Sequence, residues 1–317
     1  MHQVQMKKVL SSMPRWVQQA VFLFYTRGWN DFMDDLSSDR LVSSGRIHCD
    51  DNLFFIAGLP KSGTTWLEQL LSNTPGMVQL NKSSLRPFPR YVKMNDVHDV
   101  IPEMLTCAPK NRLSFLKLHL NPNQDNFNTL DGLNIKTVVQ IRDLRDMLIS
   151  RYFHILAKPT HWDHKRLKGL TQNEQLLESM ITPIPDGTQT VIEYYGNWIS
   201  GWLERAKKSS QNTRIISFEQ LKNDVHTVLE NIYSFYGYQI IPSEIQRVVE
   251  KQKNRYAIHL KEGLGRNLKK KGRSVSTFRK GTIGEWRKYF DDRTKRLFKE
   301  SGGQILIDSG YESDFNW

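Results

Sequence analysis

The sequence has little of what would place a chain of 317 residues in several common classes of protein. Its two cysteines, Cys49 and Cys107, are too few for a disulfide scaffold or a cysteine-based metal site. The longest apolar stretch near the start, residues 17–25, contains Gln18 and Gln19 and falls well short of the roughly 20 residues that span a membrane. We also find no signal-peptide cleavage pattern and no internal repeat. The sequence therefore predicts a cytoplasmic protein.

Charge of the two signs is unevenly distributed along the chain. The formal net charge of +12 comes entirely from residues 251–300, which hold 17 Lys and Arg against five Asp and Glu, while the remainder holds 28 of each. Such a segment suits a polyanionic partner: nucleic acid, an anionic membrane or a phosphorylated ligand. From charge alone, however, a solvated lysine-rich surface is the better explanation.

Short apolar segments alternate with helical patterns. Hydrophobic residues make up 38% of the chain, more than a disordered protein would contain. Buried parallel strands are predicted where the apolar runs are short and mostly not alternating, at residues 53–57, 113–118, 136–141 and 214–218. Helical patterns cover residues 65–71, 144–155, 190–207 and 225–236. This order predicts one α/β domain over residues 46–317, with a central parallel β-sheet flanked by helices and preceded by a helical extension over residues 1–45.

Ligands of such sheets bind at the carboxyl ends of the strands, so the segment after the first strand is the first candidate. Residues 58–66 (Gly-Leu-Pro-Lys-Ser-Gly-Thr-Thr-Trp) combine small residues with a helix N-terminus, which together favour phosphate binding. The spacing of Gly58 and Gly63 matches the nucleotide-triphosphatase loop, but Thr64 stands where that motif has lysine, and Lys61 lies inside the loop. The sequence thus predicts a P-loop-like strand–loop–helix of a different kind.

Residues 60–66 resemble the 5′-phosphosulfate loop of the cytosolic-type sulfotransferases, which use 3′-phosphoadenosine 5′-phosphosulfate as sulfuryl donor. Three further segments resemble that family in the same order. Residues 117–120 resemble the segment of its catalytic histidine, residues 139–150 its 3′-phosphate motif, and residues 278–290 its C-terminal signature. The resemblance implies sulfuryl transfer from this donor to a hydroxyl group of a small or lipid-like acceptor.

The resemblance implies a donor site assembled from all of these segments. Arg142 and Ser150, roughly two helical turns apart, would face the 3′-phosphate, although Arg142 has Asp143 and Asp146 as alternative partners. Trp66 would stack on the adenine. The implied donor contacts are Lys61, Ser62, Gly63, Thr64, Thr65, Trp66, Arg142, Ser150, Phe218, Arg279, Lys280 and Gly281, with Phe218 standing where the family commonly has tyrosine.

His119 is the candidate general base, because the acceptor hydroxyl must lose its proton and a neutral histidine suits that task. His154 is the alternative base. Lys61 and Lys117 would stabilise the negative charge that develops on the sulfuryl and departing phosphate oxygens. We expect no metal ion, since lysines can neutralise the phosphosulfate bridge and no Cys/His cluster with zinc spacing occurs in the sequence.

Two other functions remain open at this stage. A P-loop kinase or triphosphatase would turn over ATP with Mg²⁺ and would be indifferent to a 3′-phosphate. A nucleic-acid-binding module using residues 251–300 would bind oligonucleotides with a steep salt dependence. That module leaves the Lys61 loop and His119 unexplained, and we expect no nucleic-acid partner.

The acceptor pocket is expected to come from residues 81–110 and 156–190. Their aromatic residues Phe88, Tyr91 and Trp162 favour a partly apolar hydroxylated molecule, either an alcohol or a phenol.

One departure from the family concerns assembly. Animal members often dimerise through a Thr-Val segment followed by Glu, and here Asp291-Asp292 and Arg296 occupy those places. We predict that this dimer mode is absent, which leaves a monomer or another interface.

Overall fold

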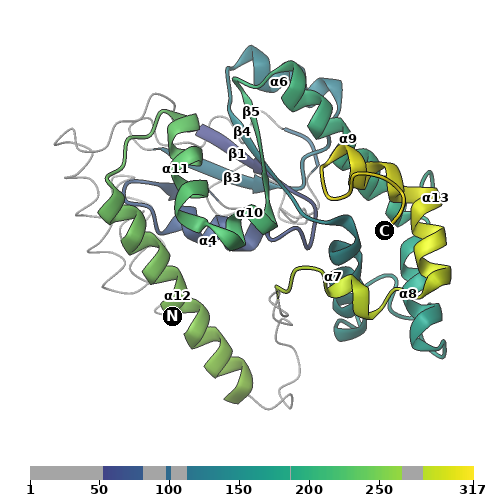
Figure 1. The fold of residues 1–317 in the computed structure, drawn as a ribbon. Helices are drawn as coiled ribbons and strands as arrows, with labels where there is room; N and C mark the ends of the chain where they lie inside the picture. Colours follow the sequence, from purple (N-terminus) through teal and green to yellow (C-terminus); the bar gives the residue numbers. More distant parts are fainter. Residues whose placement is uncertain (1–52, 81–97, 101–112, 186, 266–280) are drawn as a thin grey trace, which may run out of the picture.

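The computed structural model describes residues 53–80, 98–100, 113–185, 187–265 and 281–317 (Figure 1). The predicted helical extension over residues 1–45 and nearly all of the predicted acceptor segment 81–110 lie outside these residues. The strands are β1 (Leu53–Ala57), β2 (Val78–Gln79), β3 (Ser114–Leu118), β4 (Thr137–Ile141) and β5 (Thr213–Ser217). The helices are α4 (Thr64–Ser72), α6 (Gln124–Gly132), α7 (Leu144–Ala157), α8 (Gln172–Ile181), α9 (Val191–Lys208), α10 (Phe218–Asn223), α11 (Val225–Tyr236), α12 (Pro242–Gly265) and α13 (Asp292–Asp308), with a 3₁₀ turn, η2 (Glu285–Lys288).

The five strands form one parallel sheet in the order β2-β3-β1-β4-β5. The prediction of a single α/β domain around a parallel sheet is confirmed. The four predicted strands occur within one residue of their predicted ends. Three of them, β1, β3 and β4, are mostly apolar and buried on both faces of the sheet, whereas the edge strand β5 is only partly buried. The two-residue strand β2 was not predicted, since so short a segment carries no periodicity.

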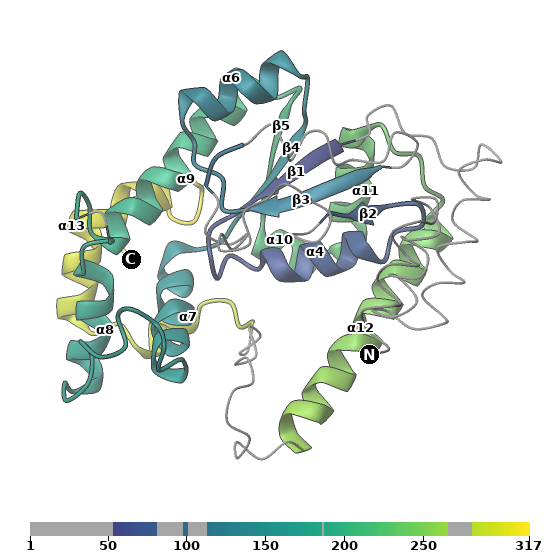
Figure 2. The same cartoon turned by 180° about the vertical axis from the view of Figure 1, so that it is seen from behind.

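Successive side chains of the strands enter two separate cores, one on each face of the sheet. Phe54 and Ile56 of β1 pack with α4, α10, α11 and α12, whereas Phe55 and Ala57 pack with α7, α8, α9 and α13. Figures 1 and 2 show the two groups of helices on opposite sides of the sheet, with α12 extending away from it.

The sequence prediction placed Phe218 at the end of a strand, and the structure places it at the first position of α10 instead. The change has a local cause. The Ser217 side chain accepts a hydrogen bond from the Gln220 backbone N–H, and the Gln220 side chain accepts one from the Ser217 N–H. This capping box ends the strand at Ser217, one residue before its predicted end, and starts α10, a helix that was not predicted.

Four of the predicted site segments follow strands and therefore gather at one edge of the sheet. The loop at residues 58–63 follows β1, His119 follows β3, Arg142 follows β4 and Phe218 follows β5. From β1 the chain first adds β2 and β3 on one side of β1 and then β4 and β5 on the other side. The loop after β1 therefore lies where the strand order reverses. That position is where open α/β sheets bind ligands.

Candidate active site

The loop between β1 and α4 has a tightly specified backbone. Lys61 has φ 77°, which is rare for a residue other than glycine, and Gly63 has φ 94°. The buried Ser62 hydroxyl donates to the Leu59 carbonyl at 2.8 Å, so this side chain braces the loop from within. From β4, the Gln140 side-chain amide donates to the Ser62 carbonyl at 3.1 Å. One hydrogen bond within the loop and one from β4 thus fix the conformation of the loop.

Gly63 allows no side chain. A Cβ there would lie 2.5 Å from a ring carbon of Phe218 and 2.9 Å from the Gln140 amide nitrogen. Its positive φ adds a backbone reason for glycine. Gly63 is the N-cap of α4, so the unpaired N–H groups of the first helical turn lie at the loop. The backbone therefore provides donor groups and a helix dipole of the kind that favours an anion.

His119 is tied to the start of this loop. Only 6% of the residue is exposed, and its Nδ1–H donates to the Gly58 carbonyl oxygen. Because a carbonyl can only accept, Nδ1 carries the proton of the neutral ring, and Nε2 is the nitrogen free to accept one. Burial, together with the positive charge of Lys117, lowers the pKa of His119 to about 4, although the bond to Gly58 acts in the opposite direction. His119 is therefore neutral at physiological pH.

His98 also contacts the strand end that carries His119. Its Nδ1–H donates to the His119 carbonyl at 2.9 Å. The segment around His98 is fixed by the buried Asn126, whose amide donates to the carbonyls of Asn121 and His98 and to the Asp99 carboxylate. The backbone on both sides of His119 is thereby held in place.

His154, the alternative base, lies in a different environment. It is half-buried on α7, and its ring centroid lies 6.0 Å from that of His161. Burial, followed by the charges of Lys61 and Lys158, lowers its pKa to about 4. Lys61 is thus close enough to act on His154 electrostatically, but no described hydrogen bond fixes the orientation of the His154 ring.

Phe218 lies next to three other residues that are predicted to contact the sulfuryl donor. Its ring meets Trp66 edge to face at 5.8 Å between centroids, and the guanidinium carbon of Arg142 lies 4.4 Å from its ring centroid. A Cβ built on Gly281 would lie 3.5 Å from the same ring. Residues from α4, β4, α10 and the C-terminal signature therefore converge on one aromatic ring. Phe218 follows β5 and His119 follows β3, so the two residues lie on opposite sides of the loop after β1.

Arg142 is buried and only partly satisfied. Its Nη2 donates to the Thr282 carbonyl at 2.7 Å and lies 3.6 Å from the Asp146 carboxylate. Asp143, the other partner considered from the sequence, instead makes a bidentate pair with Arg145. Arg142 Nε has no hydrogen-bond partner among the described residues. A buried guanidinium with an unused donor is suited to receiving an anion.

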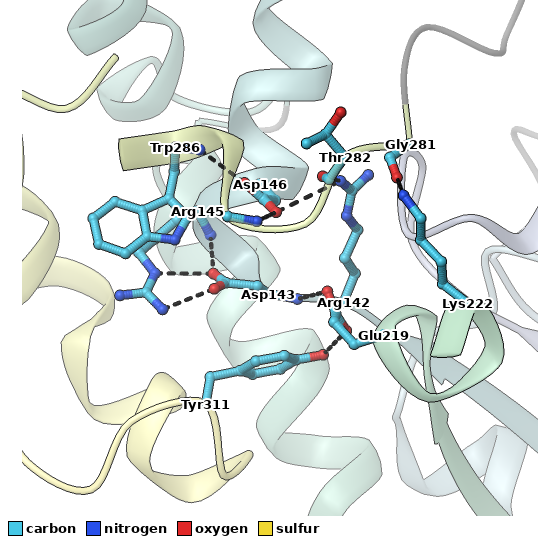
Figure 3. A network of polar contacts seen from close by, with 11 residues as sticks. Arg142, Asp143, Arg145, Asp146, Glu219, Lys222, Gly281, Thr282, Trp286 and Tyr311 are labelled. Atoms are coloured by element: carbon cyan, nitrogen blue, oxygen red, sulfur yellow. Dashed lines mark hydrogen bonds and ion pairs between the residues drawn. The ribbon is translucent and has the colours of Figure 1, made fainter. Parts of the chain in front are cut away.

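Asp146 fastens the C-terminal signature to α7 (Figure 3). Its carboxylate accepts from the Gly284 N–H at 2.7 Å and from the Trp286 N–H at 2.9 Å. Burial raises the pKa of Asp146, although these two bonds and Arg142 favour its charged form. The segment that begins at Gly281 is therefore anchored beside Arg142. At Gly281 itself, Lys222 of α10 donates to the carbonyl oxygen.

The last residues of the chain pack next to the segment that Asp146 holds. The Arg145 guanidinium lies 3.9 Å from the centroid of the Trp286 ring and 4.5 Å from that of Trp317, and it pairs with Glu312 at 2.6 Å. Figure 3 also shows Tyr311 directed at Glu219, and its hydroxyl donates to that carboxylate at 2.6 Å. Residues beyond α13 thus pack against the junction of β4 and α7.

The structure brings the loop residues, His119, Arg142, Phe218 and Gly281 to one edge of the sheet. Thr64 is buried, whereas Thr65 and Trp66 are half-buried. Ser150 is buried on α7, and its hydroxyl forms no hydrogen bond with a described residue. Arg279 and Lys280 lie outside the described residues, as do Phe88 and Tyr91.

Sequence reasoning missed the supporting residue Gln140, and it named Asp146 only as an alternative partner of Arg142, not as the residue that holds the C-terminal segment. Both carried a usable signal. Gln140 is an amide in the middle of the apolar strand β4, and a polar residue there requires a partner. Asp146 follows Arg142 by four residues, which places it within reach of that cation. What it holds, the backbone of residues 284–286, lies some 140 residues away and left no local trace.

The described residues contain no group of three or more His, Cys, Asp or Glu side chains that could hold a metal ion. No helix among them has the length and apolar character to cross a membrane.

Known proteins show which family this site belongs to. The family model for the sulfotransferase domain matches residues 51–310. A guinea pig 3-alpha-hydroxysteroid sulfotransferase is 26% identical over 246 residues, covering 73% of this chain and 75% of that protein. A flavonol 3-sulfotransferase from Flaveria bidentis is 22% identical, covering 90% of this chain and 93% of that protein.

Solved structures agree on the fold. A mouse sulfotransferase complexed with PAP superposes with a TM-score of 0.58 at 20% identity, over 82% of this chain and 86% of that one. A retinol dehydratase in complex with androsterone and PAP gives a TM-score of 0.53 at 21% identity, over 81% of each chain. The chain belongs to the sulfotransferase family and is a transferase enzyme.

Proposed function

We propose that this sulfotransferase transfers the sulfuryl group of 3′-phosphoadenosine 5′-phosphosulfate to a hydroxyl group of a small or lipid-like acceptor. The observation that carries the proposal is the hydrogen bond from His119 to the Gly58 carbonyl. It ties a buried neutral histidine to the first residue of an anion-binding loop, with Nε2 as its basic nitrogen. The PAP found in the two solved relatives, adenosine 3′,5′-bisphosphate, is the product of this donor and supports the same choice.

The residues present suit such a donor. The loop backbone and the first turn of α4 would bind the 5′-phosphosulfate, with Lys61, Ser62, Gly63, Thr64 and Thr65 around it. Trp66 and Phe218 would enclose the adenine.

At the other end, Arg142 with its unpartnered Nε would bind the 3′-phosphate. Ser150 and Gly281 would add hydrogen-bond donors to the same group. Arg279 and Lys280 remain predictions from the sequence.

In the proposed reaction, His119 Nε2 accepts the proton of the acceptor hydroxyl while that oxygen forms a bond to sulfur. The bond between sulfur and the bridging phosphate oxygen breaks on the opposite side. Lys61 and Lys117 stabilise the charge that this departing oxygen gains. The products are a sulfate ester and adenosine 3′,5′-bisphosphate, and no metal ion is required by this scheme.

For the acceptor, we infer a hydroxylated molecule with apolar surface. The sulfotransferases similar to this chain include ones named for hydroxysteroids and for flavonols. Trp162, 51% exposed, lies in the described part of the predicted acceptor segment. A cytoplasmic location, and the absence of the Thr-Val dimer mode, stay predictions.

The proposal is tested first by binding. Calorimetric titration should show that adenosine 3′,5′-bisphosphate binds without metal and more tightly than ADP with Mg²⁺. Tighter binding of ADP with Mg²⁺, accompanied by ATP hydrolysis, would favour the kinase or triphosphatase alternative instead. A screen of steroids, flavonols and simple phenols with labelled donor then identifies the acceptor. Absence of any label transfer over a broad screen would argue against the donor assignment.

A further inference from the structure

A partly buried carboxylate lies beside the predicted active-site residue Lys117, although the predicted ligand there is an anion. Glu68, on the second turn of α4, places its carboxylate 3.9 Å from the Lys117 ammonium of β3. The two side chains are only 19% and 11% exposed. Neither the sequence motif nor the proposed reaction gives Glu68 a role.

The carboxylate is held by more than this ion pair. The side-chain amide of Gln79, on β2, donates to Glu68 Oε1. The Ser72 hydroxyl of α4 donates to the Gln79 side-chain oxygen at 2.9 Å, which orients that amide. Burial raises the pKa of Glu68, whereas Lys117 and Gln79 favour its charged form. Ser72, Gln79, Glu68 and Lys117 thus form one chain of polar contacts across α4, β2 and β3.

This chain ends beside the proposed base. Lys117 and His119 are two residues apart at the end of β3, so they lie on the same face of the strand. The charge of Lys117 lowers the pKa of His119, as does His98 from the segment at residues 98–100, while the Gly58 carbonyl raises it. The position of the Lys117 ammonium therefore affects both the base and any anion bound at the loop.

We propose that Glu68 is a positioning residue that acts through Lys117. It holds the ammonium between α4 and β3 and offsets part of its positive charge, which keeps His119 a stronger base than an unpaired Lys117 would allow. This inference rests on the proposed function for its catalytic consequence, but its electrostatic consequence for His119 does not.

The kinetic test uses Glu68→Gln, which keeps the shape of the side chain and removes its charge. We expect kcat to fall by about tenfold, because Lys117 is no longer held and the basicity of His119 declines. Affinity for adenosine 3′,5′-bisphosphate should stay within about threefold, since the lost charge is negative and faces an anion. The matched control is Glu204→Gln, on the exposed face of α9, where Glu204 pairs with Lys208. It should leave both values unchanged.

A double variant shows whether Glu68 acts through the lysine. In a Lys117→Met background, the further change Glu68→Gln should alter kcat by less than about twofold, because the group it positions is gone. An undiminished tenfold loss in that background would overturn the inference. So would wild-type kcat in the single variant, or an equal loss of kcat and of nucleotide affinity. If Glu68→Gln folds poorly in thermal unfolding, Glu68→Asp serves instead and should retain most of the activity by keeping the charge.

An independent readout needs no turnover. NMR titration of the His119 ring should give a pKa lower in Glu68→Gln than in wild type by roughly half a unit to one unit, because the charge of Lys117 is no longer offset. An unchanged or raised pKa would overturn the inference even in an active enzyme. Conversely, an absence of sulfuryl transfer by the wild type together with the expected shift would reject the proposed function and leave the role of Glu68 intact.

Discussion

The two ends of the proposed donor site are held in different ways. At the phosphosulfate end, the loop is shaped by its own backbone, by Ser62 bonding to Leu59 three residues away, and by the neighbouring strands. At the 3′-phosphate end, Asp146 and Arg142 hold residues 282–286 of a segment about 140 positions later in the chain. One end is thus a local structure placed on a sheet edge, whereas the other exists only when the C-terminal part of the chain has packed.

This difference indicates how each end should respond to substitution. A substitution in the loop would violate a steric requirement that only the residue already there meets. It should therefore weaken the binding of every nucleotide. A change in the long-range anchor loosens one segment while the loop remains intact, so it should affect only ligands that carry a 3′-phosphate. The following experiments, beginning with the chemistry at the loop end, use this contrast.

The largest effect is expected from His119→Ala. Loss of a positioned general base should reduce kcat by about 10²- to 10⁴-fold, while adenosine 3′,5′-bisphosphate binds within about threefold of wild type. His154→Ala is the matched control, because His154 has a similarly lowered pKa but no fixed ring orientation, and it should lose less than about tenfold. Steady-state kinetics and calorimetry measure both. Near-normal turnover in His119→Ala, or a greater loss in the control, would assign the base elsewhere.

Gly63→Ala tests the loop end. The added Cβ would lie 2.5 Å from the Phe218 ring at a positive φ, so binding of adenosine 3′,5′-bisphosphate and of adenosine 5′-phosphosulfate should both weaken by about tenfold or more. Gly132→Ala, at the end of α6 with no atom within 4 Å of its Cβ position, should bind both ligands normally. Isothermal titration of the two ligands checks this. Selective loss of only one ligand would show that the loop does not serve the whole nucleotide.

Asp146→Asn tests the other end. An amide cannot accept both backbone N–H bonds as a carboxylate does, and each lost bond to a charged group costs about 1–3 kcal/mol. We expect roughly tenfold weaker binding of adenosine 3′,5′-bisphosphate and less than twofold change for adenosine 5′-phosphosulfate, measured by the same titrations. The exposed Asp308→Asn on α13 is the control. Equal weakening of both ligands would mean that the anchor supports the fold and not the 3′-phosphate specifically.

The smallest effect concerns pH. A base must be neutral to act, and the pKa of His119 is lowered to about 4, so protonation should inactivate the free enzyme only as the pH falls through that value. Between pH 5.5 and 8, His119 should therefore change kcat/KM for the donor by less than about twofold. An acid limb centred near 6.5, lost in a His119→Asn variant that retains residual activity, would show that His119 is not desolvated in the free enzyme.

Much of the loop end could be predicted from the sequence. Gly58, Lys61 and Gly63 occur in one short segment, and the strand before it is an uninterrupted apolar run, so composition and spacing specify both the turn and its place at the strand end. Residues in the other segments, such as His119 and Arg142, were identified by their order along the chain and by resemblance to a family. Their positions after parallel strands then follow from the topology.

The contacts between residues far apart in the sequence could not be predicted in the same way. Nothing near Asp146 indicates that it holds the backbone of Gly284 and Trp286, and nothing near Arg145 indicates that Trp286 and Trp317 flank it. Phe218 was placed on the wrong element because the Ser217–Gln220 capping box overrode the strand pattern by one residue. The pairing of Glu68 with Lys117 joins α4 to β3, and nothing in the sequence of either element indicates it.

By itself, the sequence determined the α/β class and the glycine-bearing loop after the first strand, because burial periodicity and backbone freedom at glycine are local properties of the chain. The resemblance of four segments indicated the family. Only the tertiary structure decided which charges face one another. It placed a carboxylate beside Lys117, fixed the tautomer of His119 through a carbonyl 61 residues away, and packed the C-terminal segment against Arg142 and Asp146. The physical reason is that pKa values and charge pairing depend on burial and distances in space, which spacing along the chain does not specify.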